Sequence, residues 1–152
     1  MERIENILNF KKNDEYLSTS GQPTEVEFNL IANEGFDVVI NFRPEEEMLG
    51  VFDERRLVEN LGLKYFQIPM TFDTLNNQIL SKFFEVLEYN NGKKIFVHCH
   101  RNIRVSVLII LYRLIILGWE REVALKEFSE FIEVTPMWED YIDEHIRQFS
   151  VQ

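Results

Sequence analysis

The sequence predicts one α/β domain with a central, mostly parallel sheet of about four to five strands flanked by helices. Short runs of β-branched and aromatic residues alternate with longer stretches of helical periodicity, and this alternation implies a parallel sheet covered on both faces. The length of 152 residues suits a single domain over 1–152. Hydrophobic residues form 45% of the chain and charged residues 28%, which is an ordinary globular composition.

The first half of the chain is predicted to hold three strands and two helices. Thr24 and Glu27 have the spacing of a capping box, which predicts a helix that ends before Gly35. The segment Phe-Asp-Val-Val-Ile-Asn-Phe is rich in residues that favour a buried strand. In order, the predicted elements are a strand over 15–19, a helix over 24–34, a strand over 36–42, a helix over 53–61 and a strand over 63–68.

The second half is predicted to be helical around one further strand. Apolar residues between 75 and 90 recur with the spacing of an amphipathic helix. The apolar run at 105–117 is shorter than the roughly 20 residues that span a bilayer, so it predicts a buried helix. The predicted elements are a helix over 75–90, a strand over 94–98, the helix of the apolar run, which ends near Gly118, and helices over 121–134 and 136–149.

The net charge and the cysteine content limit the expected binding partners and the expected cellular compartment. The net charge of -10 argues against nucleic acid and anionic membranes as partners. A single cysteine allows no internal disulfide, and the N-terminus has no apolar region of signal-peptide type, so a reducing, cytoplasmic location is expected. The interval 89–119 contains five basic residues and no acidic one. Such an interval indicates either an anion site or the usual scarcity of acids in buried elements.

Ligands bind to parallel sheets of this kind beyond the carboxyl ends of the strands, which selects the segments 41–44, 69–73 and 98–104. In the last of these, Cys99 lies between a predicted strand and a predicted helix. Free backbone amides and the helix dipole favour an anion there, and the same field favours a thiolate. A thiolate beside a bound phosphate can attack phosphorus, and Arg104 can clamp the phosphate oxygens. Asn102 suits a left-handed backbone position.

Each of these residues also has a purely structural interpretation. A cysteine after a strand is most often a small buried residue, and a histidine at a strand end is usually structural, which applies to His98 and more strongly to His100. Arg101 suits a solvated surface position. Metal catalysis is not expected, because the two histidines and Cys99 are consecutive, which is poor spacing for joint ligation.

Three segments carry a resemblance to a known family. They are Ser-Thr-Ser-Gly-Gln-Pro-Thr at 18–24, Val-Ile-Asn-Phe-Arg-Pro at 39–44, and Val-His-Cys at 97–99. With them the chain resembles the cysteine-dependent protein tyrosine and dual-specificity phosphatases over about residues 17–113, and most closely a bacterial branch of small phosphatase-like proteins. The resemblance implies the protein tyrosine phosphatase-like fold, which agrees with the predicted sheet.

The resemblance also implies roles for individual residues. Cys99 would be the nucleophile and Arg104 would bind the phosphoryl group. Ser106 would assist departure of the thiolate, and Asp73 would protonate the leaving oxygen. The phosphate would lie against the loop residues His100, Arg101, Asn102, Ile103 and Arg104, with His98 and Arg43 in support. Asp73 has an alternative role as the cap of the helix near 75. Arg43 has an alternative role in a surface ion pair with one of the glutamates at 45–47.

The spacing of the loop departs from the family pattern. The family places five residues between cysteine and arginine, whereas four lie between Cys99 and Arg104. Either one residue is deleted, or the length is kept with Asn102 in place of the family glycine and Val105 where arginine is expected. Ser106 lies seven residues after Cys99, at its expected place, which favours the second alignment.

These residues predict a phosphatase-like protein that hydrolyses phosphomonoesters through a cysteinyl-phosphate intermediate and needs no cofactor. The expected partners are a phosphorylated protein or a small phosphate ester, with inorganic phosphate or sulfate in the loop. Two alternatives stay open. One is an inactive phosphatase fold that binds phosphate, and the other is a rhodanese-like sulfurtransferase, whose loop often has four residues between cysteine and arginine.

Overall fold

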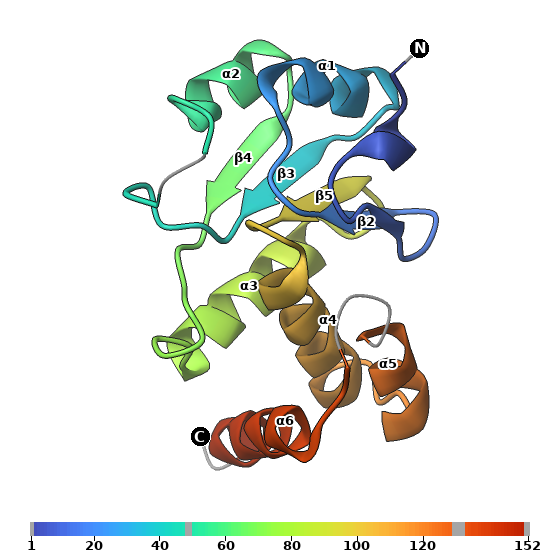
Figure 1. Cartoon of the computed structure of the whole chain (residues 1–152), viewed down its shortest axis with the longest axis vertical. Coiled ribbons are helices and arrows are strands. Elements are labelled where there is room, and N and C mark those ends of the chain that lie inside the picture. The colour runs from blue at the N-terminus through green and yellow to red at the C-terminus, as the bar shows by residue number, and fades with distance from the viewer. Residues whose placement is uncertain (1, 48–49, 129–132, 151–152) are drawn as a thin grey trace.

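The computed structural model describes residues 2–47, 50–128 and 133–150. Its centre is a five-stranded sheet in the order β1-β2-β5-β3-β4 (Figure 1). The first strand pairs antiparallel with the second, and the other neighbours are parallel. The predicted α/β architecture is therefore confirmed. The strands are β1 (Lys11–Lys12), β2 (Leu17–Ser20), β3 (Val38–Asn41), β4 (Lys64–Gln67) and β5 (Ile95–His98).

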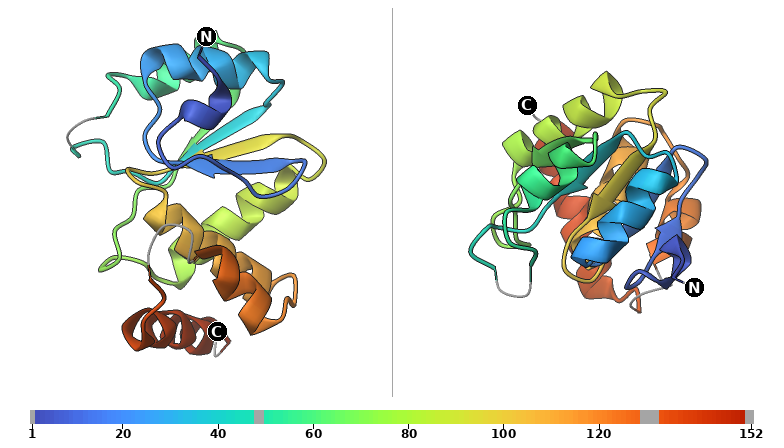
Figure 2. Two further views of the ribbon diagram at one scale, coloured as in Figure 1. Left: turned by 45° about the vertical axis from the view of Figure 1, so that its right-hand side comes forward. Right: turned by 90° about the horizontal axis from the view of Figure 1, so that it is seen from above.

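Helices cover both faces of the sheet (Figures 1 and 2). One face carries the short 3-10 helix η1 together with α1 and α2. The other is covered by α3 and α4, against which α5 and α6 pack. The helices are η1 (Ile4–Asn6), α1 (Glu25–Asn33), α2 (Glu54–Asn60), α3 (Asn77–Tyr89), α4 (Ile103–Ile115), α5 (Arg121–Phe128) and α6 (Pro136–Ser150). None of the described helices is both long and apolar enough to cross a membrane.

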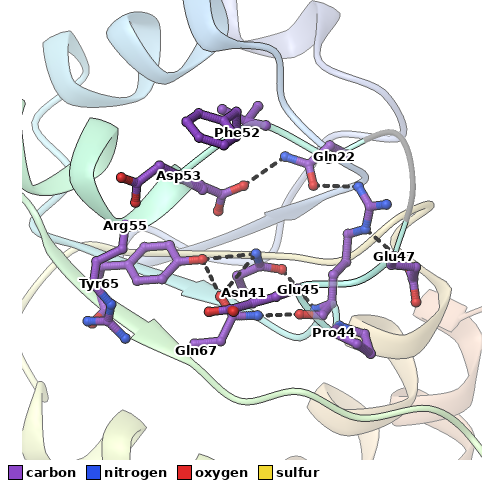
Figure 3. A pocket seen from close by; sticks show the side chains of 14 residues that line it. Gln22, Asn41, Pro44, Glu45, Glu47, Phe52, Asp53, Arg55, Tyr65 and Gln67 are labelled. Carbon is purple, nitrogen blue, oxygen red and sulfur yellow. Dashed lines mark hydrogen bonds and ion pairs between the residues drawn. The ribbon is translucent and has the colours of Figure 1, made fainter.

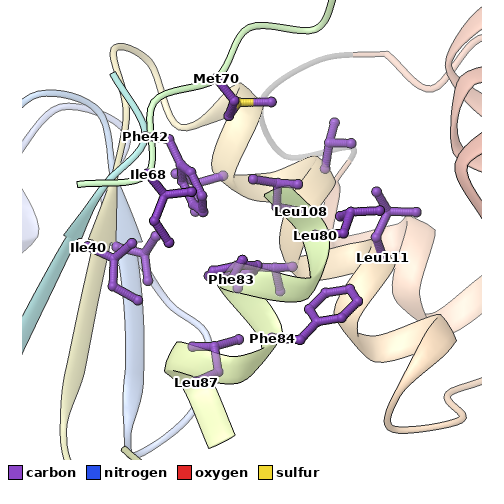
Figure 4. Close-up of a cluster of buried hydrophobic side chains, with 14 of the residues drawn as sticks. Ile40, Phe42, Ile68, Met70, Leu80, Phe83, Phe84, Leu87, Leu108 and Leu111 are labelled. Atoms are coloured by element: carbon purple, nitrogen blue, oxygen red, sulfur yellow. The ribbon is translucent and has the colours of Figure 1, made fainter. Parts of the chain in front are cut away.

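The central strand β5 divides the hydrophobic interior in two. Because side chains alternate along a strand, Ile95 and Val97 face the α3–α4 side while Phe96 faces the α1–α2 side. Figure 4 shows the larger cluster, in which the rings of Phe42 and Phe83 meet edge to face with centroids 4.9 Å apart. Burial on both faces fixes β5 in the middle of the sheet, and its carboxyl end carries the cysteine loop.

Most predicted elements match the structure within a few residues. The capping box of Thr24 and Glu27 is present with both of its hydrogen bonds, as predicted. The helix predicted over 121–134 is present from Arg121 to Phe128, but its predicted end was wrong, because residues 133 and 134 are not helical. Residues 129–132 lie outside the described part. The sequence analysis also missed η1 and the two-residue strand β1.

Candidate active site

The cysteine loop connects the end of β5 to the start of α4. Asn102 precedes the helix with φ 67°, so the predicted left-handed position is confirmed. Its side-chain amide donates to the Asn9 carbonyl oxygen at 2.8 Å and to Thr19 Oγ1 at 3.0 Å. These bonds connect the loop to the N-terminal segment and to β2. They also offset the unfavourable conformational free energy of a non-glycine residue in the left-handed region.

The start of α4 supplies amides to the loop. The first N–H groups of a helix have no acceptor within the helix, so the amides of the first turn of α4 face the loop without intrahelical partners. One turn into the helix, Ser106 Oγ donates to the Asn102 carbonyl oxygen at 2.5 Å. Val105 is fully buried in the α3–α4 cluster. This arrangement favours the alignment that keeps the loop length, with Asn102 in the left-handed place and Val105 where the family has arginine.

Cys99 lies at the base of this loop and is 1% exposed. Its side chain belongs to the same buried cluster as Val97 and Val105, on the α3–α4 face of the sheet. Its backbone N–H donates to the Ser20 carbonyl oxygen at 3.4 Å, which links the loop to the end of β2. The loop and the α3–α4 cluster thus enclose the Cys99 side chain.

His98 lies on the opposite face of the sheet from the Cys99 side chain, in a buried ion pair. Its Nε2 donates to Glu54 Oε2 at 2.6 Å, and its Nδ1 lies 3.3 Å from the Cys99 carbonyl oxygen. The imidazole is thus held from both sides, by a carboxylate at one nitrogen and by a backbone carbonyl near the other. Burial alone would raise the pKa of Glu54, but the charge and hydrogen bond of His98, with a hydrogen bond from Gln22, hold it below its usual 4.5.

The guanidinium groups of Arg43 and Arg104 meet at one carboxylate, that of Glu47. Arg104 donates through Nη2 to Glu47 Oε1 at 2.7 Å and through Nη1 to Oε2 at 3.1 Å, and Arg43 donates through Nε to Oε1 at 3.0 Å. Arg104 also donates to the Met70 carbonyl oxygen at 3.1 Å, so its guanidinium bridges the loops that follow β3 and β4. The ion pair predicted as the alternative for Arg43 is therefore present, with Glu47 as the partner. Its predicted surface location is wrong, because Arg43 is 2% exposed.

A polar hollow of about 380 Å³ lies beside these arginines, between α2 and the carboxyl ends of β3 and β4 (Figure 3). Arg43 Nη1 donates to Gln22 Oε1 at 2.7 Å, and Gln22 in turn donates to Glu54 at 2.9 Å. The Asn41 side chain donates to the Tyr65 hydroxyl at 3.0 Å on the floor of the hollow. These contacts connect the Arg43 guanidinium to the buried Glu54–His98 pair.

His100 lines a second hollow, of about 410 Å³, together with Gln22 and Phe52. Its Nδ1 is buried and has no hydrogen-bond partner among the described residues. Burial, followed by the charges of Arg43 and Arg101, lowers the pKa of His100 below its usual 6.5. The imidazole is therefore predominantly neutral at pH 7.

Two further predicted site residues, Arg101 and Asp73, have exposed side chains. Arg101 is exposed, as its structural interpretation predicts, and its carbonyl oxygen accepts from Asn9. Asp73 is exposed in the loop after β4. The alternative that Asp73 caps α3 is wrong, because Asn76 is the N-cap and accepts from the Ile79 N–H at 2.9 Å. Tyr141 of α6 holds this loop by donating to the Phe72 carbonyl oxygen at 2.7 Å.

Sequence reasoning gave no site role to Gln22 or Glu54, and it left open which of the glutamates at 45–47 pairs with Arg43. Glu54 had a detectable signal, since it shares a helix face with the buried Val58, one turn later. Glu47 had no such signal, because Glu45, Glu46 and Glu47 are consecutive and only the folded chain selects one of them. No group of three or more metal-ligating side chains occurs within residues 2–47, 50–128 and 133–150.

Solved structures share this architecture over nearly the whole chain. A DUF442 protein from Shewanella putrefaciens CN-32, with a proposed phosphatase function, is 26% identical, with a TM-score of 0.81 and 96% of each chain covered. The core catalytic domain of the PP-IP phosphatase SIW14 from S. cerevisiae has a TM-score of 0.74 at 20% identity, over 91% of this chain and 86% of that domain. This chain has the protein tyrosine phosphatase-like fold. TpbA of P. aeruginosa shares that fold with a TM-score of 0.72 at 16% identity, over 97% of this chain and 86% of TpbA.

The sequence comparisons point to further relatives of this phosphatase-like protein. No family model matches the chain. The "Beta-lactamase hydrolase-like protein" of Agrobacterium fabrum is 28% identical over 101 residues, which are 64% of this chain and 23% of the relative. The protein of that name from Xylella fastidiosa is 29% identical over 105 residues, 67% of this chain and 24% of the relative. The chain thus spans about a quarter of the length of these curated relatives.

Proposed function

We propose that this phosphatase-like protein is a phosphomonoesterase that acts through a cysteinyl-phosphate intermediate on Cys99. The observation that carries the proposal is the position of Cys99 between the carboxyl end of the central parallel strand and the free amides of α4. Both the amides and the helix dipole favour a phosphoryl group there. The 26% identical DUF442 structure supports the same reaction class.

In the first step, the Cys99 thiolate attacks phosphorus while the bond from phosphorus to the ester oxygen breaks. The leaving oxygen takes a proton from Asp73, which lies exposed in the loop after β4. In the second step, water attacks phosphorus and gives a proton to the Asp73 carboxylate, the sulfur–phosphorus bond breaks, and inorganic phosphate leaves. Ser106, whose hydroxyl now donates to the Asn102 carbonyl oxygen, would turn towards the departing sulfur and stabilise it as a thiolate.

The remaining loop residues are proposed to hold and orient the phosphoryl group. The backbone amides of His100, Arg101, Asn102 and Ile103 would donate to its oxygens, together with the Arg104 guanidinium. Arg43 lies close enough to share an anion with Arg104, since both now bind one carboxylate. His98 would support the loop from the other face of the sheet through its contact with the Cys99 carbonyl oxygen.

A phosphorylated protein or a small phosphate ester is the substrate class that we propose. TpbA has been crystallised with phosphotyrosine and the SIW14 domain with citrate, so related folds hold phosphate esters or comparable anions. Side chains of both charge signs line the hollow beside Arg43, which suits a polar substrate. We also propose a cytoplasmic location, which suits the single free cysteine.

A continuous assay with an aryl phosphate, between about pH 5 and pH 8, tests the proposal. We expect turnover that vanadate inhibits and that disappears in Cys99→Ser, while Glu59→Ala, at an exposed position of α2 outside both hollows, retains it. Absence of turnover in the wild type, or equal turnover in Cys99→Ser, would refute the proposal. Transfer of sulfur from thiosulfate to cyanide would instead support the rhodanese-like alternative, which the fold comparisons do not favour; nor do they favour the inactive binding module.

A further inference from the structure

The carboxylate of Glu47 occupies the point at which Arg43 and Arg104 converge. It accepts three hydrogen bonds of 2.7–3.1 Å from the two guanidinium groups, and two of them form a bidentate contact with Arg104. Paired, charge-assisted bonds of this kind are the usual way in which arginine binds carboxylate or phosphate. The two arginines therefore already form an anion site, and a side chain of the protein fills it.

The local charge balance leaves this site electropositive even with Glu47 in place. Two guanidinium groups face one carboxylate, and both lower the pKa of the nearby His100. The hydrogen bond from Arg104, followed by its charge and the contacts of Arg43, outweighs burial and lowers the pKa of Glu47 below its usual 4.5. Glu47 is therefore ionised at neutral pH and competes with any other anion for the same donors.

The three side chains differ in how freely they can move. The Arg43 side chain is 3% exposed and that of Arg104 is 13% exposed, whereas that of Glu47 is 30% exposed. Glu47 lies in a turn after β3, where its N–H donates to the Pro44 carbonyl oxygen at 3.1 Å. The carboxylate can therefore turn into solvent while the arginines stay fixed. Because the two guanidinium groups are buried, an incoming anion has to replace the carboxylate as their partner when Glu47 leaves.

We propose that Glu47 is an internal competitor that holds the oxyanion position between Arg43 and Arg104, and that a phosphoryl group binds by displacing it. The inference rests on the proposed function and adds to it, because it assigns the ligand of the arginine pair and the group that must leave. A phosphate dianion and the carboxylate repel each other, so the two exchange at the site. Arg104 stands one position earlier in the loop than the family arginine. Release from Glu47 frees its guanidinium to bind the phosphoryl group.

Calorimetric titration with inorganic phosphate tests this directly. We compare the wild type with Glu47→Gln, which keeps the side-chain shape and removes the charge, and with Glu46→Gln, which removes a neighbouring exposed charge. We expect phosphate to bind roughly tenfold more tightly to Glu47→Gln, because charge-assisted bonds are released for the ligand. Glu46→Gln should bind phosphate as the wild type does. Unchanged or weaker binding to Glu47→Gln would overturn the inference, since Glu47 would then be a support for the arginines.

A second variant and a second readout keep the result interpretable. Glu47→Asp shortens the side chain and should give an affinity between those of the wild type and Glu47→Gln; an affinity below that of the wild type would contradict displacement. Phosphate-induced thermal stabilisation provides the readout if one variant is less stable. Because these assays need no turnover, they separate the two proposals. Tighter binding without hydrolysis would refute only the enzymatic proposal, and hydrolysis without an effect of Glu47→Gln would refute only the displacement.

Discussion

Replacement of Glu54 by alanine is expected to destabilise the protein strongly, because it removes the partner of the fully buried His98 ring. The side chains of His98 and Glu54 are 0% and 6% exposed, and their atoms are 2.6 Å apart. Removal of one partner of a buried ion pair costs about 3–5 kcal/mol. For a domain of about 150 residues, this corresponds to a decrease in melting temperature of roughly 10 °C.

The pH dependence follows from the direction of the Glu54 pKa. Its pKa in the folded protein lies below 4.5, so the unfolded chain binds more protons on this group than the folded protein does. The contribution of Glu54 to stability is therefore complete above its unfolded pKa and is lost as the pH falls towards the folded pKa. Glu54→Ala should remove this part of the acid sensitivity.

Urea denaturation of the wild type, Glu54→Ala and Glu59→Ala measures these effects. Glu59 is exposed on the same helix, α2, so its variant corrects for helix propensity. The double variant Glu54→Leu/His98→Leu should recover a large part of the lost free energy, because no buried charge remains. A loss below about 1 kcal/mol in Glu54→Ala would refute the ion-pair reasoning, since that is the scale of an exposed pair. A double variant that is even less stable would indicate lost packing instead.

Three further predictions concern the loop and its supports. Asn102→Ala should lower the free energy of unfolding by about 1 kcal/mol more than Asn102→Gly, because alanine disfavours φ 67° and glycine does not. Equal losses for the two variants in urea denaturation would exclude backbone strain as the cause. Gly21→Ala should cost about 1–3 kcal/mol, because its Cβ would lie 2.6 Å from the His100 carbonyl oxygen; Gly50→Ala, whose nearest contact is at 3.4 Å, should cost less. An NMR titration should give His100 a pKa below 6.5. The contribution of His100 to stability should therefore fall as the pH drops from 6.5 towards the pKa in the folded protein. A pKa above 6.5 would contradict the electropositive site.

Local chemistry made most of the fold predictable. The capping box of Thr24 and Glu27 specifies the start of α1, and β-branched runs specify the buried strands β3 and β5, because each signal acts within a few residues. The left-handed Asn102 was predictable for the same reason. Strand β1 was not predictable, because its two lysines show no strand pattern. It forms by pairing with β2.

The site was predictable only in part, because its polar contacts join distant segments. The sequence identifies the loop and Cys99, but the contact of Glu47 with Arg104 spans 57 residues and depends on how two loops meet beyond the sheet. The spacing of residues in the cysteine loop likewise did not predict the direction in which the Arg104 guanidinium points. It is set by Glu47 and by the Met70 carbonyl oxygen, neither of which is adjacent to it in sequence.

The formation of a sulfur–phosphorus bond on Cys99 is the claim on which the account depends most. Acid quenching during turnover of an aryl phosphate, followed by peptide mass spectrometry, measures it directly. We predict one phosphoryl group on the peptide that contains Cys99 in the wild type, and none on that peptide in Cys99→Ser. Turnover by the wild type with the phosphoryl group on another residue, or on none, would contradict the account.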